Sequence, residues 1–261
     1  MKALFLGYGK MGSALGEAWL NAGLVDSLVA VDPGQPQGLR AQVVDSAAKA
    51  TGRFDLVVVA VKPAMAAGVI ASLPAEALQG ATLVSVMAGV SCATLAAASP
   101  EGTPVVRAMP NTPVMLGAGC TGLFASDLND NLRQLLSRLF EAVGVAFWVE
   151  HEELLHAITA LSGSGPAYYH LFSEALADAG IALGLPEVLA RQLAANTALG
   201  AARLQCQPDA DFKALRTAVT SPNGTTAAAI EHFEADAALR RLVKDAATAA
   251  FDRSVELGKI E

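Results

Sequence analysis

Charged residues are scarce in this chain, and no run of lysine or arginine occurs in it. Only 16% of the 261 residues are Asp, Glu, Lys or Arg, and the formal net charge at pH 7 is -7. About a quarter of residues are charged in typical soluble domains. Nucleic-acid binding needs basic side chains that displace counterions from phosphates. The chain has no obvious surface of this kind, so we expect no nucleic-acid partner.

Cysteine and histidine are also few. The three cysteines stand far apart and form no CxxC pair: Cys92, Cys120 and Cys206. This arrangement argues against a disulfide framework and a zinc site, and we interpret the cysteines as small buried residues. The four histidines show no spacing typical of a metal site and are interpreted as surface or helix-packing residues: His151, His156, His170 and His232. We therefore predict no metal.

One uncharged stretch, residues 81–100, is long enough on paper to span a membrane. Threonine, serine and glycine interrupt it, and its pattern predicts a buried strand, a turn and then a helix. A secretory signal is not indicated either, because the apolar stretch after Lys2 is short and Lys10 ends it. We expect a cytoplasmic protein without a membrane partner.

Short apolar runs alternate with helical patterns through about residue 150. This alternation is typical of α/β proteins with a parallel sheet between helices. A helix is predicted at about 11–21, and strands are predicted at 2–6, 28–31, 56–61, 82–87, 104–109 and 145–149. We therefore predict that residues 1–150 form a Rossmann-like, doubly wound dinucleotide-binding domain.

From His151 onward the pattern changes to long helical segments rich in alanine and leucine. Residues 151–261 are predicted to form a separate all-α domain for dimerisation and substrate binding. Helices that are apolar nearly all round must be buried, and so short a domain has too few neighbours to bury them. We expect a homodimer or a higher homo-oligomer.

A glycine-rich turn, Gly7-x-Gly9-x-x-Gly12, separates the first predicted strand from the first helix. In this context the first glycine permits the tight turn, the second lets the backbone approach a pyrophosphate, and the third allows close packing of helix and strand. Asp32 follows twenty residues after Gly12, at the end of the second strand, where a carboxylate accepts hydrogen bonds from a ribose 2'-OH. The turn predicts a dinucleotide site.

Two later loops lead into helices and are rich in Ser, Gly, Pro and Thr: ALSGSGPAYY (160–169) and AVTSPNGTTAAAI (218–230). In the second loop, hydroxyls and free N–H groups at a helix N-terminus suit a substrate carboxylate. An ordinary N-cap and turn is the alternative interpretation.

These motifs together resemble the pyrroline-5-carboxylate reductase family. The resemblance runs through the whole chain, in FLGYGKMG, AVKP, MAG, RAMPNTP, ALSGSGPAY and TSPNGTT. It implies a Rossmann domain, a helical domain that interlocks with its partner, and reduction of 1-pyrroline-5-carboxylate to L-proline with NADPH or NADH.

The resemblance also implies roles for particular residues. It places the cofactor pyrophosphate at Gly7, Gly9, Lys10, Met11 and Gly12, a loop over the cofactor at Ala60, Val61, Lys62 and Pro63, and the nicotinamide near Ala88 and Gly89. It places the substrate carboxylate at Ser221, Gly224, Thr225 and Thr226, with Ser221 and Thr226 as catalytic residues and Thr226 in reach of the ring nitrogen. Two positions depart from the family pattern: Asn223 replaces a usual glycine, and Thr217 replaces a common acidic residue.

Reduction of a cyclic imine asks little of the protein beyond orientation, because the imine nitrogen can carry its own proton. A β-hydroxyacid dehydrogenase is the competing enzyme class, but Tyr169 stands where its lysine is required. A nucleotide-sensing regulator is a further alternative and has no use for the TSPNGTT loop.

The sequence favours NADH over NADPH. Asp32 would repel a 2'-phosphate, and no Lys or Arg precedes Arg40 to offset it. The alternatives are that Arg40 swings in, or that Asp32 turns away to cap its own turn.

Overall fold

The computed structural model describes residues 1–259, which form two compact units. Unit 1 contains Met1–Ser164 together with the described residues from Ala250 onward, and unit 2 contains Gly165–Ala249.

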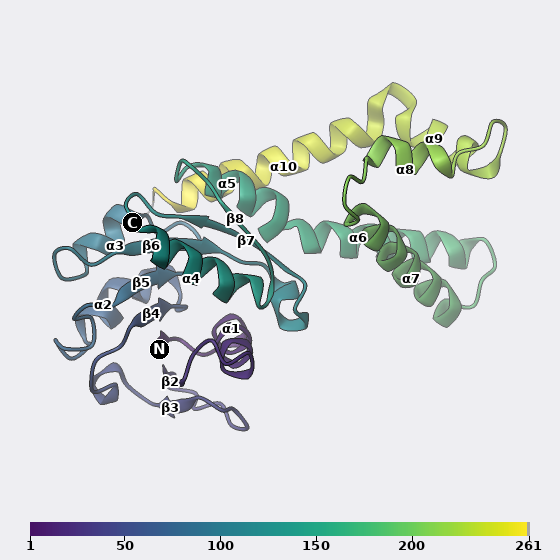
Figure 1. Ribbon diagram of the computed structural model, residues 1–261. Coiled ribbons are helices and arrows are strands. Elements are labelled where there is room, and N and C mark those ends of the chain that lie inside the picture. Colours follow the sequence, from purple (N-terminus) through teal and green to yellow (C-terminus); the bar gives the residue numbers. More distant parts are fainter. Residues whose placement is uncertain (260–261) are drawn as a thin grey trace. The chain divides into compact units, whose positions relative to one another are not determined.

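Unit 1 is built on an eight-stranded sheet with the order β3-β2-β1-β4-β5-β6-β7-β8 (Figure 1). All neighbouring strands run parallel except β6 and β7. The strands are β1 (Lys2–Leu6), β2 (Ser27–Val31), β3 (Gln42–Val44), β4 (Leu56–Val59), β5 (Thr82–Ser85), β6 (Val105–Met109), β7 (Gly119–Phe124) and β8 (Gly144–Trp148). The predicted Rossmann-like sheet is confirmed, with β3 and β7 as additions that the apolar pattern did not reveal.

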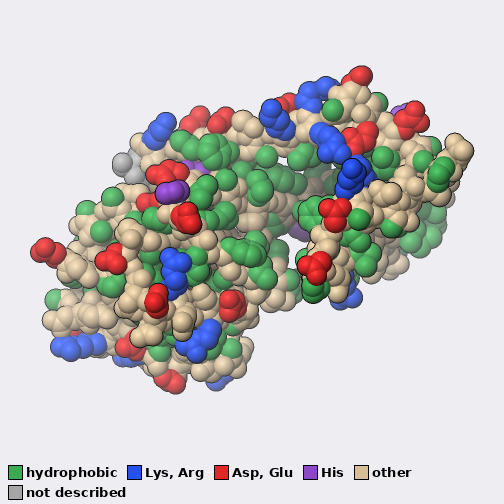
Figure 2. All heavy atoms as spheres, turned by 45° about the horizontal axis from the view of Figure 1, so that its top comes forward, with side chains coloured by type: hydrophobic (Ala, Val, Ile, Leu, Met, Phe, Trp, Pro, Cys, Tyr) green, Lys and Arg blue, Asp and Glu red, His purple; other side chains and the backbone are tan. Residues whose placement is uncertain are grey.

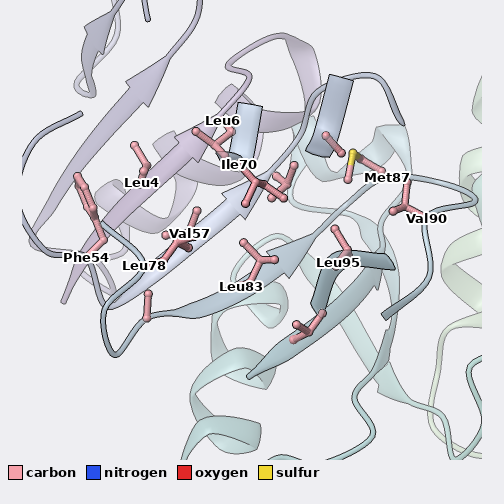
Figure 3. Close-up of a cluster of buried hydrophobic side chains, with 14 of the residues drawn as sticks. Leu4, Leu6, Phe54, Val57, Ile70, Leu78, Leu83, Met87, Val90 and Leu95 are labelled. Carbon is pink, nitrogen blue, oxygen red and sulfur yellow. The ribbon is translucent and has the colours of Figure 1, made fainter. Parts of the chain in front are cut away.

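Helices cover both faces of this sheet, because successive side chains of a strand point to opposite faces. Ala3 and Phe5 of β1 pack into one cluster with residues of α1 (Lys10–Asn21) and α4 (Asp130–Glu141). Leu4 and Leu6 pack into the other cluster, which Figure 3 shows. That second cluster also holds residues of α2 (Ala66–Ala71), α3 (Cys92–Ala97) and α5 (Leu154–Ile158).

Short helical turns complete the loops of unit 1: η1 (Ala47–Lys49), η2 (Pro63–Met65), η3 (Thr112–Leu116) and the π-helix η4 (Thr159–Gly163). The other helical elements are α6 (Gly165–Ala182), α7 (Glu187–Gln205), α8 (Phe212–Ala218), α9 (Thr225–Glu234), η5 (Ala235–Ala237) and α10 (Ala238–Leu257). The last residues of α10 belong to unit 1.

Unit 2 has almost no hydrophobic core of its own. Helices α6 and α7 approach closely at Gly180, where an added Cβ would stand only 3.3 Å from Ala190 Cβ. The buried apolar cluster between them consists of three small residues, Ala177, Ala190 and Ala194. Large apolar side chains on the same two helices are exposed, among them Leu171, Phe172, Leu183, Val188 and Leu193. Figure 2 shows hydrophobic side chains at the surface of one face of the molecule.

Other sequence-based predictions have mixed outcomes. The uncharged stretch 81–100 forms β5, a turn and α3, as predicted. Within the described part of the chain, no helix has the length and apolar character needed to cross a membrane. Cys92 is buried as predicted and Cys120 is half-buried, but the prediction is wrong for Cys206, which is exposed. Cys206 follows the last turn of α7, in the unit that buries little.

Candidate functional site

The predicted cofactor residues of unit 1 lie in loops that follow parallel strands. The sheet order reverses between β1 and β4: β2 and β3 lie on one side of β1, and the chain then crosses to the other side, where β4 pairs with β1. Parallel strands end at one edge, and ligands of doubly wound sheets bind outside that edge at such a reversal. The loops after β1, β2, β4 and β5 begin at Gly7, Asp32, Ala60 and Val86. The structure therefore brings these four loops to one edge.

The three glycines of the first turn have different surroundings. Gly7 has φ +91°, and a Cβ there would stand 2.6 Å from Ala60 O. Only glycine therefore lets the loop after β1 contact the loop after β4. A Cβ at Gly12 would collide with Gly7 O. At Gly9, by contrast, no atom of the described chain lies within 4 Å of a Cβ position. The open space at Gly9 is a cradle that a Cβ would enter.

Helix α1 begins directly at this cradle. Gly9 is its N-cap, and no side chain among the described residues caps it. The first N–H groups of a helix lack intrahelical acceptors and carry the positive end of the helix dipole. Lys10, Met11 and Gly12 are the residues that present these groups. The arrangement fits a pyrophosphate.

The carboxylate of Asp32 is engaged with backbone groups beside the cradle. Its Oδ2 accepts a hydrogen bond from Tyr8 N at 2.9 Å, and its Oδ1 accepts one from Gly34 N at 2.8 Å. Asp32 thus caps its own turn and also supports the glycine-rich loop. Each carboxylate oxygen retains a second lone pair for another donor.

The side chain of Arg40 points to helix α1. Its Nη1 donates to Asn21 Oδ1 at 2.8 Å, and its backbone N donates to Glu17 Oε2 at 2.9 Å. Glu17 Oε1 also accepts from the hydroxyl of the buried Tyr8 at 2.9 Å. Arg40, the first basic residue in the sequence after β2, therefore already has a hydrogen-bond partner for its guanidinium.

The remaining cofactor candidates lie in the loops after β4 and β5. Ala60 and Val61 are half-buried, whereas Lys62 and Pro63 are exposed at the start of η2. Ala88 is half-buried, and Gly89 is buried with φ +86°. A Cβ at Gly89 would stand 3.3 Å from the carbonyl of Leu257, so the end of α10 lies against this loop.

The predicted substrate loop belongs to unit 2 and precedes α9. Gly224 is the N-cap of α9, which no side chain of the described residues caps. A Cβ at Gly224 would collide with Ser221 Oγ, so this hydroxyl lies over the start of the helix. Thr225 and Thr226 form the first turn. Hydroxyls and uncapped N–H groups thus converge on one exposed helix end, which suits a carboxylate.

The two departures from the family pattern have local structural explanations. Asn223 has φ +59°, a left-handed conformation that asparagine tolerates better than most residues other than glycine. Thr217 Oγ1 donates to Lys213 O at 2.9 Å inside α8. Asparagine therefore occupies a conformation suited to glycine, and the threonine hydroxyl is satisfied within its own helix.

Asn111 connects two of the family motifs, a role that the sequence analysis missed. Its Nδ2 donates to Ser162 O at 2.9 Å, and its Oδ1 accepts from Cys120 N at 2.8 Å. Ser162 lies in the π-helix η4, and such turns often occur at functional sites. The signal in the sequence was the presence of Asn111 in the family motif RAMPNTP.

An ion pair between a buried arginine and a half-buried glutamate lies near the loop after β5. Arg107 Nη1 contacts Glu152 Oε1 at 2.8 Å, and the same oxygen accepts a hydrogen bond from Cys92 N at 2.8 Å. Burial raises the pKa of the Cys92 thiol to about 12, so this thiol stays protonated at neutral pH. Burial, followed by the charge of Arg107, lowers the pKa of His156 below its ordinary value.

Comparisons with known proteins agree along the whole chain. Residues 152–257 match a family model described as pyrroline-5-carboxylate reductase dimerisation, and residues 2–89 match one described as NADP oxidoreductase, coenzyme F420-dependent. The pyrroline-5-carboxylate reductase of Pseudomonas aeruginosa is 39% identical, over 98% of this chain and 96% of its own. That of Haemophilus influenzae is 36% identical, over 97% and 96%.

Solved structures show the same similarity. A pyrroline-5-carboxylate reductase from Coxiella burnetii superposes with a TM-score of 0.89 at 33% identity and covers 98% of this chain and 97% of its own. A pyrroline carboxylate reductase from Plasmodium falciparum with NADP bound gives a TM-score of 0.87 at 28% identity and covers 99% and 98%.

Proposed function

This chain belongs to the pyrroline-5-carboxylate reductase family, and from that premise we propose how its residues carry out the reaction. It is an oxidoreductase that reduces the C=N bond of 1-pyrroline-5-carboxylate to give L-proline, the last step of proline biosynthesis, with a nicotinamide cofactor. The observation that supports the residue roles is that α1 and α9 both begin at a glycine N-cap with no side-chain cap among the described residues, Gly9 in unit 1 and Gly224 in unit 2. We call the space around each of these helix ends a cradle.

We propose that the first cradle holds the coenzyme pyrophosphate. The N–H groups of Lys10, Met11 and Gly12 would donate to it, and Gly9 leaves room for it. The loop Ala60–Pro63, with Val61 and Lys62 between, would cover the coenzyme, and Ala88 and Gly89 would lie beside the nicotinamide ring. A bound reduced nicotinamide supplies the hydride.

We propose that the second cradle holds the substrate. Ser221, Thr225 and the N-terminal N–H groups of α9 would bind its carboxylate, and the Thr226 hydroxyl would hydrogen-bond the ring nitrogen. The imine nitrogen brings its own proton, so these residues have to orient and bind rather than move a proton.

We propose that residues 1–150 bind the coenzyme and that residues 151–261 bind substrate and form the homodimer. We also propose that the protein works in the cytoplasm without a nucleic-acid partner, because its acidic composition lacks basic runs.

The activity is tested by following NADH and NADPH oxidation by the pure protein with 1-pyrroline-5-carboxylate. We expect oxidation of at least one coenzyme that depends on the imine. A protein that oxidises neither coenzyme with this imine, but does so with the oxidation product of a 3-hydroxyacid, would instead be a β-hydroxyacid dehydrogenase.

Thr226→Ala is expected to lower turnover without weakening coenzyme binding. Loss of one hydrogen bond to a charged group costs about 1.5 to 3 kcal/mol, which is about 10- to 150-fold in rate. Steady-state kinetics give kcat and KM, and fluorescence titration gives the Kd of the coenzyme. Thr217→Ala is the matched control, since the Thr217 hydroxyl donates to Lys213 O within α8. Normal turnover with weakened coenzyme binding would reverse the assignment.

We propose that Asp32 makes NADH the favoured coenzyme. Its carboxylate caps its own turn, but it lies beside the glycine-rich loop and each oxygen keeps a second lone pair for a ribose hydroxyl. The Arg40 guanidinium that could offset a 2'-phosphate is bonded to Asn21. Asp32→Ser is expected to raise kcat/KM for NADPH relative to NADH by about 10-fold, because removing one like charge gains a few kcal/mol at most in a screened site. Asp45→Ser, at a half-buried aspartate paired with Lys49, is the control. A wild-type enzyme that prefers NADPH tenfold, unaffected by Asp32→Ser, would show that Asp32 does not read the ribose.

A further inference from the structure

The segment Ala88–Cys92 follows β5 and leads into α3. It is held at two places, directly by Glu152, which precedes α5, and through the end of α10 by His156, which lies in α5. We infer that Glu152 and His156 are positioning residues, which set the place of the nicotinamide-side loop Ala88–Gly89 without touching the substrate. This inference rests on the proposed function, which puts that loop beside the nicotinamide.

The first attachment runs through Glu152. Its Oε1 accepts from Cys92 N, the first residue of α3, at 2.8 Å, and it pairs with Arg107 Nη1 at 2.8 Å. Arg107 lies on β6 and is 4% exposed, so the central sheet fixes the carboxylate. Because Cys92 follows three residues after Gly89, the ion pair holds the C-terminal side of the loop.

The second attachment runs through His156. Its Nδ1 is 2.9 Å from Ser254 Oγ on α10, and its ring packs edge-on against Phe251 with centroids 6.1 Å apart. Ser254 is 5% exposed, so this hydrogen bond is shielded from water. His156 therefore holds the last turns of α10 within unit 1.

The end of α10 is the part that meets the loop. A Cβ at Gly89 would stand 3.3 Å from the carbonyl carbon of Leu257, and a Cβ at Gly258 would stand 3.3 Å from Gly89 O and 3.6 Å from His156 Cε1. Gly89, Gly258 and the imidazole thus form one packed contact. A displacement of α10 would remove the contact that restrains Gly89, and glycine, which has no Cβ, could then leave its left-handed conformation for others.

The rate of hydride transfer is sensitive to this placement, because misplacement of reacting groups by about 1 Å can cost about 100-fold. The pyrophosphate cradle at Gly9 follows a different strand and has no part in the contact. Loosening the attachments should therefore slow the chemical step and leave coenzyme affinity almost unchanged. A purely structural role would instead reduce the fraction of folded enzyme.

The test is the single-turnover rate constant of NADH oxidation at saturating imine, since a first-order rate constant does not depend on the fraction of active enzyme. Ser254→Ala is expected to lower it by about 3- to 10-fold, with the Kd for NADH unchanged within twofold. Ser137→Ala is the matched control, because Ser137 Oγ is likewise hydrogen-bonded to a ring nitrogen, accepting from Trp148 Nε1 at 2.8 Å, away from the loop. The Ser137→Ala variant should keep the wild-type rate constant.

Two further variants connect the effect to the named contacts. His156→Phe should slow the step as Ser254→Ala does, and the double variant should be no slower than either, because both remove one hydrogen bond. Glu152→Ala should slow the step, and Glu152→Gln, which keeps an acceptor oxygen for Cys92, should restore most of it. Wild-type rate constants in Ser254→Ala and Glu152→Ala, or additive losses in the double variant, would overturn the inference. A wild-type protein inactive with the imine would instead overturn the proposed function.

Discussion

Gly9→Ala is expected to lose tight coenzyme binding while the protein keeps its stability. Gly9 has φ -70° and ψ -163°, a conformation that alanine adopts readily, and no atom of the described chain is within 4 Å of the new methyl group. The methyl group would instead occupy the space proposed for the pyrophosphate. Loss of one or two hydrogen bonds to a charged group costs about 1.5 to 3 kcal/mol each, so we expect Kd to rise by at least about 10- to 100-fold.

Fluorescence titration of NADH and thermal unfolding measure the two effects separately. Gly12→Ala should lose both binding and stability, because its Cβ collides with Gly7 O, a backbone atom that cannot rotate away. Gly68→Ala, at another open glycine, should lose neither. If Gly9→Ala binds NADH as the wild type does, the pyrophosphate does not lie at this cradle.

The second large effect concerns assembly: we expect no stable folded monomer. The buried apolar cluster of unit 2 consists of Ala177, Ala190 and Ala194. Full burial of a large apolar side chain stabilises by about 1.5 to 3 kcal/mol, and most such side chains of this unit are exposed in the single chain. We propose that the helices of each subunit pack between those of the other, which would bury them.

Thermal unfolding at several protein concentrations tests this, because an obligate dimer unfolds at a midpoint that rises with concentration. We expect that rise, together with a dimeric or larger mass by size exclusion with light scattering at micromolar concentration. A folded monomer at that concentration, with a midpoint independent of concentration, would contradict the proposed interlocked dimer.

The sequence by itself determined that unit 1 is a doubly wound parallel sheet, apart from strands β3 and β7, and it predicted where the ligand of this sheet binds. Apolar runs such as Leu56–Val59 identify strands covered on both faces, because a buried strand excludes polar residues on either side. The spacing of Gly7, Gly9 and Gly12 between a strand and a helix predicted the cradle, because backbone clearance at each position depends on a side chain being absent. These are local signals, readable in any short window of the chain.

Features that depend on partners distant in sequence were decided only by the tertiary structure. Strand β7 contains two glycines, so its own residues show little preference for a strand. It forms because it pairs with β6 and β8. The Arg107–Glu152 pair, the contact of His156 with Ser254 and the position of Leu257 against Gly89 join segments far apart in the chain. No periodicity encodes such contacts, because they depend on where folding brings whole elements together.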